Sequence, residues 1–436
     1  MRKPLILLAA LLLLTVGWSG AFLLGISNGT GRNLWIIPAL AIGAGLGLSL
    51  RQVSGARTAM LLVVSAVLGL ATVQTLSPTS HISLKNLHSF ISGTSFRTRT
   101  LPLRVTPQLR TPPFDRPLNF TSPLDLDLSL YGRMPAGISD FCFAPDGALY
   151  VSLPELGAVY RLSAGKTSTP GDLFLHGLDH PSGLACRQDR ILVATGTALL
   201  AAGYDKGQPR ILAGGLPDDG DRLDHRLLAV DDQIYLSIEA RCDACPEKQA
   251  LRATLQSIDG DGKMREFARG LRQVGGLAFD PAGKRFWASE RSRLFPAPGA
   301  ADELNLIQSG ADYGWPGCDA EEPDAPGCQG KVAPTRTLRR HANPADLVMS
   351  RELAYPGVYR DSMLLVLQGD AEVKMVPAVA RLPLRDGIPQ EPVAFLAGWD
   401  GRTTRPAAIE IGPDGALYIG DDLNGAIYRA AWQGSR

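Results

Sequence analysis

An imidazole beside a carboxylate is the first feature of this chain that could do chemistry. His225 follows Asp224 in the stretch GDRLDHRLLAV, just before an apolar run of the kind that forms a buried strand. A neighbouring carboxylate orients an imidazole and raises its basicity, which is what a general base requires. On spacing alone, a histidine in a surface turn is the more common meaning of this pattern.

Cationic side chains recur at equivalent positions before two later apolar runs. Arg272 and Gln273 stand in GLRQVGGLAF, and Arg405 stands in GRTTRPAAIEI. Together with His225, three strand starts therefore carry His, Arg and Arg. Guanidinium groups that converge on one place bind anions well. If the fold brings these starts together, the set predicts an anionic ligand.

Other kinds of chemistry have no comparable pattern. None of the six histidines shows zinc-ligand spacing, and there is no Gly-x-Ser-x-Gly sequence or phosphate-binding glycine loop. The formal charge is +1 without a basic stripe, which argues against nucleic acid as a partner. The sequence DGDG at 259–262 lacks the remaining acids of an EF-hand loop and is expected to form a hairpin turn.

Three apolar runs precede these residues, at 4–25, 34–50 and 58–76. A helix needs roughly 20 apolar residues to cross a bilayer, so the first and third runs qualify and the second is marginal. A cleaved signal peptide is the rival interpretation of the first run. The flanking arginines and lysine predict two to three transmembrane helices over 1–76 in the inner membrane. The later residues then face the periplasm or the exterior, with a linker over 77–130.

The cysteines support an oxidising location. All six lie between residues 142 and 328, and an even number outside the cytoplasm favours disulfides. Cys318 and Cys328 close the short loop CDAEEPDAPGC and are the first expected bridge. Cys242 and Cys245 form CDAC, which is either a tight disulfide or a redox pair. Covalent haem is excluded there, because Pro246 stands where a histidine is needed.

The chain beyond residue 130 consists of short strand-like runs separated by turns. ISDFCFAPDGALYVSLPELGAVYRL from Ile138 and PAAIEIGPDGALYIGDDLNGAIYRA from Pro406 share the order strand, Pro-Asp-Gly turn, strand, glycine turn, strand. Weaker copies lie between them, the first ones about every 43 residues, a period typical of propeller blades. We expect an all-β fold, a six-bladed β-propeller of four-stranded blades over 131–436.

Three stretches resemble the glucose/sorbosone dehydrogenase family: GLRQVGGLAFDPAGKRFWASE, DELNLIQSGADYGWPGC and RPAAIEIGPDGALYIGDD. The resemblance extends over about residues 130–433, and the second stretch is its most specific part. It implies a six-bladed propeller that uses pyrroloquinoline quinone (PQQ) and calcium to oxidise an aldose or a related sugar. The three apolar runs lie outside the resemblance.

The resemblance also implies roles for individual residues. His225, following Asp224, would take the proton from the anomeric hydroxyl, and His341 would lie on the substrate side. The residues implied to contact PQQ are Arg272, Gln273, Arg405 and Lys374. The implied calcium ligands are Glu303 and the carbonyl of Tyr313 for a structural ion, and the carbonyls of Ser292 and Arg293 for the cofactor's ion.

The chain departs from the family in the stretch ERSRLFPAPGAADEL, where basic and apolar residues replace most of the family's acids. Gln273 likewise replaces an asparagine. The leading prediction is a membrane-anchored sugar oxidoreductase that passes electrons to an external acceptor such as a membrane quinone. The alternatives are a propeller without cofactor that binds glycans or proteins, and a propeller lactonase.

Overall fold

The computed structural model describes residues 98–434 except 165–170, 206–207, 221–222 and 297–298, together with Leu14 and Ser65. The chain divides into two units between residues 97 and 98. Apart from Leu14 and Ser65, the three predicted spans lie outside the described residues, as does the first part of the predicted linker. Among the residues that are described, no helix is long and apolar enough to cross a bilayer.

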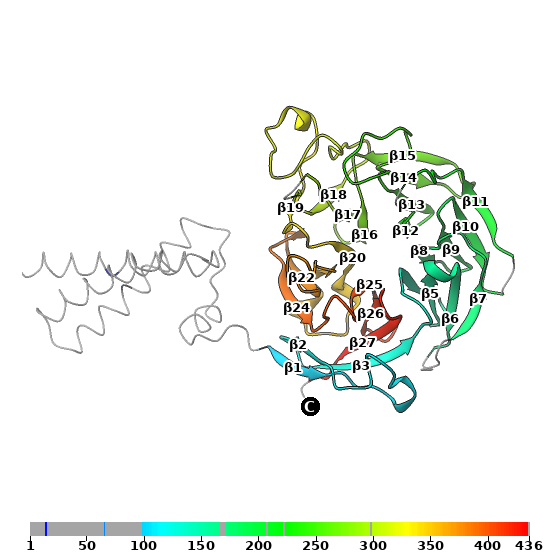
Figure 1. Ribbon diagram of the computed structural model, residues 1–436, viewed down its shortest axis with the longest axis vertical. Coiled ribbons are helices and arrows are strands. Elements are labelled where there is room, and N and C mark those ends of the chain that lie inside the picture. The colour runs from blue at the N-terminus through cyan, green and yellow to red at the C-terminus, as the bar shows by residue number, and fades with distance from the viewer. Residues whose placement is uncertain are drawn as a thin grey trace, which may run out of the picture. The chain divides into compact units, whose positions relative to one another are not determined.

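The second unit is an all-β propeller whose six sheets surround a central axis (Figure 1). Five of the sheets have four strands. The first and second blades are β4 (Asp140–Phe143), β5 (Leu149–Leu153), β6 (Ala158–Leu162), β7 (Asp172–Leu175), and β8 (Gly183–Cys186), β9 (Arg190–Ala194), β10 (Ala198–Gly203), β11 (Arg210–Gly214). The third and fourth are β12 (Leu227–Val230), β13 (Gln233–Ile238), β14 (Thr254–Ile258), β15 (Met264–Arg269), and β16 (Val274–Asp280), β17 (Arg285–Glu290), β18 (Glu303–Ile307), β19 (Arg336–Thr337).

The fifth sheet departs from the predicted four-stranded plan, because it has seven strands. Its strands are β20 (Pro344–Met349), β21 (Ser362–Leu367), β22 (Ala378–Arg385), β24 (Val393–Ala397), β2 (Asn119–Ser122) and β1 (Arg99–Pro102), with β23 (Ile388–Pro389) paired to β22. The prediction of six four-stranded blades is therefore correct for five sheets only. Residues 98–130 were assigned to the linker, yet they supply β1, β2 and the start of β3 (Leu126–Arg133).

The last sheet closes the ring by joining the two ends of the propeller. It contains β25 (Pro406–Ile411), β26 (Leu417–Asp421), β27 (Ala426–Trp432) and, as its outermost strand, β3. β27 and β3 pair antiparallel from Ala426 opposite Arg133 to Trp432 opposite Leu126. Each inner strand contacts the inner strands on both sides, from β4 and β8 round to β25 and β4. The ring therefore has no open edge at its axis.

Short turns and apolar interfaces keep the blades in place. In the first Pro-Asp-Gly turn, Gly147 has φ +78° and its amide donates to the carbonyl of Ala144 at 2.8 Å, a geometry that glycine adopts without strain. Between the fourth and fifth sheets, Trp287 is fully buried against Met363 and Leu365. The described helices are short: α5 (Gly357–Arg360) and 3-10 turns at Pro107–Leu109, Pro154–Leu156, Pro326–Cys328 and Ser350–Glu352.

Cys142 and Cys186 form a disulfide that links β4 to β8, the inner strands of the first two blades. The bridge closes a loop with a sequence separation of 44 residues, so it restricts the unfolded chain strongly. We expect the variant with both cysteines changed to serine to lose about 2–4 kcal/mol of unfolding free energy, measured by denaturant titration. The matched control changes Cys318 and Cys328, which close a separation of only 10 residues outside the blades. An equal loss in both variants would contradict the prediction.

Candidate functional site

A cavity of about 370 Å³ lies where the inner strands of five sheets begin. It is lined by residues just before or at the first positions of β4, β8, β12, β16 and β25, and by loop residues from the fifth and last sheets. The sequence predicted that these strand starts converge, and this is confirmed. The ionisable side chains of the lining are Glu155, His180, Asp224, Arg226, Glu239, Arg291, Arg405 and Asp422.

The imidazole that faces this cavity is that of His180. Its Nε2 lies 3.0 Å from Oδ1 of Asp224, and both side chains are partly exposed to the cavity. The hydrogen bond to Asp224, opposed by burial, raises the pKa of His180 above its usual value. Although burial opposes it, the same bond and the charge of Arg226 lower the pKa of Asp224 to about 2. The pair is a carboxylate-oriented imidazole, the arrangement of a general base.

His225 does not line the cavity, so its predicted role as the base is corrected. It is 0% exposed, with Nδ1 3.0 Å from the carbonyl of Ser237 and Nε2 3.4 Å from that of Gly196. Burial lowers its pKa, so the ring is neutral at pH 7. Successive side chains of an extended chain point to opposite sides. Asp224 and Arg226 therefore reach the cavity, while His225 between them points into the blades.

A hydrogen-bonded arc of four residues forms another part of the cavity wall. Arg405 donates through Nε and Nη2 to Asp422 at 2.8 and 2.7 Å, and Nε2 of Gln368 donates to the same carboxylate at 2.8 Å. Arg291 donates from Nη2 to Oε1 of Gln368 at 2.8 Å. Burial, followed by repulsion from Arg226, lowers the pKa of Arg291 to about 10, so it stays charged at neutral pH. The arc fixes two guanidinium groups at the cavity.

Of the predicted pair Arg272 and Gln273, only one faces the cavity, because neighbouring side chains of an extended segment point to opposite sides. Gln273 lines the cavity, as predicted for a ligand-contacting residue. Arg272 is 2% exposed and lies behind the wall, where Nη1 donates to the carbonyls of Arg291 and Ser292 at 2.9 and 3.0 Å. Its Nε donates to the carbonyl of Asp243 at 3.0 Å. Arg272 therefore supports the wall and does not line the cavity.

Lys374 and His341 are also absent from the residues that line this cavity. Lys374 is exposed on the loop between β21 and β22, with φ +58°. His341 is partly buried before β20, and its Nδ1 lies 3.1 Å from Oδ2 of Asp370. The structure therefore does not place either side chain at the predicted cofactor or substrate position.

Three of the four predicted calcium ligands accept hydrogen bonds from within the chain: Glu303 and the carbonyls of Ser292 and Arg293. Among the described residues, no group of three or more His, Cys, Asp or Glu side chains could hold a metal ion. Glu303 is buried and accepts a hydrogen bond from Asn305 at 3.0 Å. Burial and the charge of nearby Asp302 raise the pKa of Glu303 to about 7. The carbonyl of Arg293 accepts from the amide of Ala300 at 2.9 Å, and that of Ser292 accepts from Arg272.

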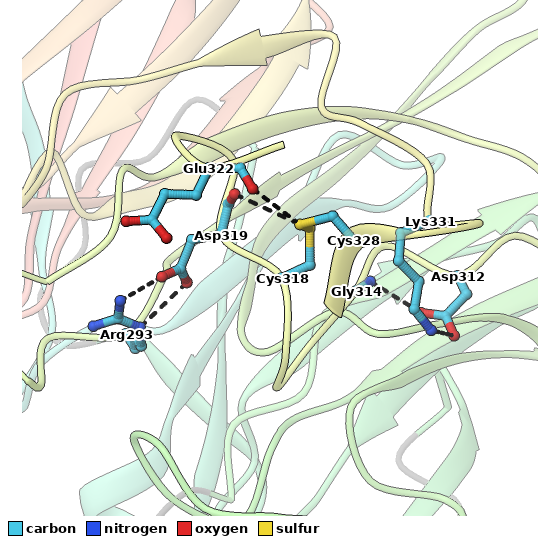
Figure 2. Close-up of a disulfide and its surroundings, with 8 residues drawn as sticks. All are labelled: Arg293, Asp312, Gly314, Cys318, Asp319, Glu322, Cys328 and Lys331. Carbon is cyan, nitrogen blue, oxygen red and sulfur yellow. Dashed lines mark hydrogen bonds and ion pairs between the residues drawn. A yellow bond between two sulfur atoms is a disulfide. The ribbon is translucent and has the colours of Figure 1, made fainter. Parts of the chain in front are cut away.

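The stretch from Asp302 to Cys318 is held in place by hydrogen bonds at its start and by a disulfide at its end. Asp302 accepts from the amides of Ser292 and Asn343 at 2.9 and 2.8 Å. Cys318 and Cys328 form the predicted disulfide, and Asp319 next to it pairs with Arg293 (Figure 2).

Two further features of this region have defined contacts. Inside the stretch, the phenol of Tyr313 donates to the carbonyl of Leu306 at 2.7 Å. Cys242 and Cys245 are also joined by a disulfide, which agrees with a tight structural bridge and with the oxidised form of a redox pair.

Sequence reasoning missed His180, Arg226, Arg291 and Asp422. A usable signal existed for His180, because it directly precedes PSGLAC, the second copy of the repeat, at the position predicted to face the axis. Its carboxylate partner is 44 residues away, so adjacency in the sequence pointed to the neighbouring histidine instead. Arg291 and Asp422 lie on loops that follow β17 and β26, the second strands of their sheets. The repeat in the sequence does not predict which residues of these loops face the cavity.

Several buried carboxyl groups predict an unusual pH dependence of stability. Burial raises the pKa of five acids to about 6 or 7: Asp140, Asp302, Glu303, Glu410 and Asp421. Between their unperturbed and raised pKa values, the folded chain binds more protons than the unfolded chain. The unfolding free energy therefore falls as pH rises through this range. His225 has a lowered pKa and offsets part of the effect.

We expect denaturation midpoints several degrees higher at about pH 5 than at about pH 8, measured by circular dichroism in buffers of equal ionic strength. Changing Asp421 to asparagine removes one of these groups and is expected to reduce the difference. A midpoint that rises from the acidic to the alkaline buffer would contradict the prediction.

Known proteins resemble this chain in both sequence and fold. The family model for glucose/sorbosone dehydrogenase matches residues 258–429. A stretch of 47 residues is 47% identical to an uncharacterized protein of Synechocystis sp. and spans 11% of this chain and 10% of that protein.

Three solved structures share the fold. The PQQ domain of a pyranose dehydrogenase from Coprinopsis cinerea has a TM-score of 0.59 and 15% identity, covering 75% of this chain and 100% of that chain. The soluble aldose sugar dehydrogenase of Escherichia coli has a TM-score of 0.55 and 17% identity over 70% and 99%. The PQQ-bound aldose sugar dehydrogenase of Streptomyces coelicolor has a TM-score of 0.51 and 18% identity over 71% and 99%.

By its fold, the second unit is a propeller of the kind found in PQQ-dependent sugar dehydrogenases. Taken with the family match, these likenesses show that the chain resembles the glucose/sorbosone dehydrogenases, as the sequence predicted.

Proposed function

We propose that this protein is a sugar oxidoreductase that uses PQQ and oxidises an aldose or a related sugar. The observation that carries the proposal is the His180–Asp224 pair, which faces a cavity that also presents three arginines. The family match and the sugar dehydrogenases that share the fold support the same reaction class. His180 therefore replaces His225 as the proposed base.

The residues of the cavity fit a small anionic ligand such as PQQ. Arg291 and Arg405 each use Nε and Nη2 on protein partners, and among the described residues Nη1 of each has no hydrogen-bond partner. These two groups and Arg226 would hold carboxylates of the cofactor, and Gln273 would add a neutral polar contact. When bound, PQQ supplies an electrophilic acceptor for two electrons.

The chain's own part in the reaction is to bind the sugar and move a proton. Nε2 of neutral His180 carries the hydrogen that is donated to Asp224, so Nδ1 would accept the proton of the hydroxyl group that is oxidised. Asp224 fixes the imidazole orientation and stabilises its protonated form. Because Asp224 raises the pKa of His180, the rate should increase with pH through a value above that of a free histidine.

A direct experiment combines binding with turnover. PQQ is titrated into the purified protein while tryptophan fluorescence is followed, and reduction of an artificial dye is then measured with several neutral aldoses. We expect saturable binding and sugar-dependent dye reduction. A protein that binds no PQQ, or binds it and oxidises none of the sugars, would overturn the proposal.

We also propose that the apolar runs before residue 77 anchor the propeller to the inner membrane, on the periplasmic or exterior side. Three disulfides support an oxidising location, and the first apolar run is long for a signal peptide. Electrons would leave to an external acceptor, of which a membrane quinone is the nearest candidate. Protease added to intact spheroplasts should remove the propeller; full protection would refute this topology.

A propeller that binds glycans or proteins without a cofactor is the second candidate. Four carboxylates line the cavity beside the three arginines, so its positive charge is largely balanced, which favours this alternative. The lactonase alternative gains no support, because the described residues contain no metal-binding group of acids and histidines. Absence of PQQ binding together with retained glycan binding would select the binding module.

A further inference from the structure

The segment 291–295 begins at the cavity wall with Arg291 and is held by the buried guanidinium of Arg272. Arg291 at its start lines the cavity, and the carbonyls of Arg291 and Ser292 accept hydrogen bonds from Nη1 of Arg272 at 2.9 and 3.0 Å. Carbonyl oxygens that converge on one point commonly mark a cation site. In this protein, the cation at that point is the guanidinium group of Arg272.

Asp243 completes the surroundings of this guanidinium. Its carbonyl accepts from Nε of Arg272 at 3.0 Å, and its carboxylate pairs with Nη2. The same carboxylate accepts from the amides of Leu294 and Phe295 at 3.0 and 2.8 Å. Asp243 lies inside the disulfide loop of Cys242 and Cys245, which fixes its backbone. Arg272 and Asp243 thus bind both ends of the segment.

The rest of the neighbourhood is built for a guanidinium. The ring of Trp315 lies 5.7 Å from the Cζ of Arg272, a cation–π distance, and Nε1 of Trp315 donates to Glu247 at 3.1 Å. Calcium takes six to eight oxygens at about 2.3–2.6 Å. The oxygens near Arg272 instead accept planar N–H groups at hydrogen-bond distances, and the carbonyl of Arg293 is used by Ala300.

We propose that Arg272 occupies the place of the calcium ion that the family resemblance implies, so that this edge of the cavity folds and binds its anionic ligand without metal. Only the ligand part of this inference depends on the proposed function. The charge delivered there is +1 and permanent, because a guanidinium keeps its proton in proteins. Chelators should therefore have no effect on a cavity edge that calcium would otherwise hold together.

The first test measures the thermal midpoint of the purified full chain in excess calcium and in EGTA. A ligand that binds only the folded state raises the midpoint, so a calcium site would appear as a shift of several degrees. We expect the two midpoints to agree, and calcium titration calorimetry to show no binding heat. A higher midpoint in calcium would overturn the inference. This test does not involve PQQ, so it decides the question even if the proposed function is wrong.

The second test measures the Kd of PQQ by fluorescence in EGTA and in calcium. Equal values support the inference, and an affinity at least tenfold higher in calcium overturns it. Absence of binding in both buffers would reject the proposed function, and the thermal test would still stand.

The variant that isolates the charge is Arg272→Met, which keeps a long apolar side chain. We expect its midpoint to fall and calcium to restore part of the loss, because the carbonyls of Arg291 and Ser292 and the carboxylate of Asp243 become available to the ion. Arg269→Met is the matched control, since Arg269 is exposed and pairs with Glu266 on the outer strand β15. Equal behaviour of the two variants would contradict the assigned role.

Discussion

Replacing His180 with asparagine is expected to lower kcat for PQQ-dependent sugar oxidation by about 10²–10⁴-fold, the usual contribution of a general base. Asparagine keeps a hydrogen-bonding group opposite Asp224, so the cavity wall stays in place, but an amide cannot accept the proton. KM for the sugar should change far less than kcat. Initial rates of dye reduction at saturating PQQ, measured over a range of sugar concentrations, separate the two constants.

Two other histidines provide controls for this variant. His176 is exposed on the same loop and lines no part of the cavity, so His176→Asn should retain the full rate. His225→Asn should lower the thermal midpoint, because the buried ring contacts the carbonyls of Ser237 and Gly196, while kcat per folded molecule is retained. Full activity of the His180 variant with an inactive but stable His225 variant would reverse the assignment.

Changing Arg405 to methionine is expected to weaken PQQ binding by about 10- to 100-fold. A hydrogen bond to a charged group contributes about 1.5–3 kcal/mol, and each 1.4 kcal/mol is tenfold in Kd. The substitution removes one of the cavity's guanidinium groups and also leaves the carboxylate of Asp422 without its ion-pair partner beside the ligand. Fluorescence titration with PQQ measures the change.

Arg402→Met is the matched control, because Arg402 is exposed three residues earlier and does not line the cavity. The double variant Arg405→Met, Asp422→Asn removes the unpaired negative charge and should recover part of the lost affinity. An unchanged Kd in the Arg405 variant would show that the ligand does not reach the arc formed by Arg405, Asp422, Gln368 and Arg291.

The repeat in the sequence was sufficient to predict a propeller and the convergence of its strand starts. The Pro-Asp-Gly copies at 145–147 and 413–415 occupy equivalent hairpins of the first and last blades, and both glycines have positive φ. The repeat could not show whether the side chain of each residue before a strand faces the cavity or is buried between the blades. A shift of one residue along an extended segment exchanges buried and facing positions, and this separates His225 from Asp224.

The strands of the predicted linker were missed for a different reason. In β1 and β2 only three side chains are buried, those of Leu101, Phe120 and Ser122, because these strands extend the outer edge of a sheet. Such strands show little apolar alternation, and β24, the pairing partner of β2, lies far along the chain, with Ala397 opposite Thr121. By contrast, β3 alternates regularly between buried and partly buried residues, and a boundary at 131 cut through it.

The calcium prediction rests on positions in the sequence, whereas metal binding depends on which atoms those positions leave available. Ser292 and Arg293 occupy the implied positions, but their carbonyls are engaged by Arg272 and Ala300. The stretch 290–304 signalled the change, because basic and apolar residues stand where acids were expected. Finding Arg272 beside these carbonyls required the three-dimensional contact between the residues before β16 and the loop after β17.

The pairing of β3 with β27 sets an order of events during biosynthesis. Residues 126–133 emerge from the ribosome among the first of the propeller, yet their partner at 426–432 is synthesised last. Until then one side of β3 presents unpaired backbone amides and carbonyls, which invite pairing with other chains. During synthesis, β3 therefore has to be kept from pairing with other chains until the C-terminal strand β27 is made. A chain that is truncated before residue 426 lacks β27, so its last sheet cannot close the propeller.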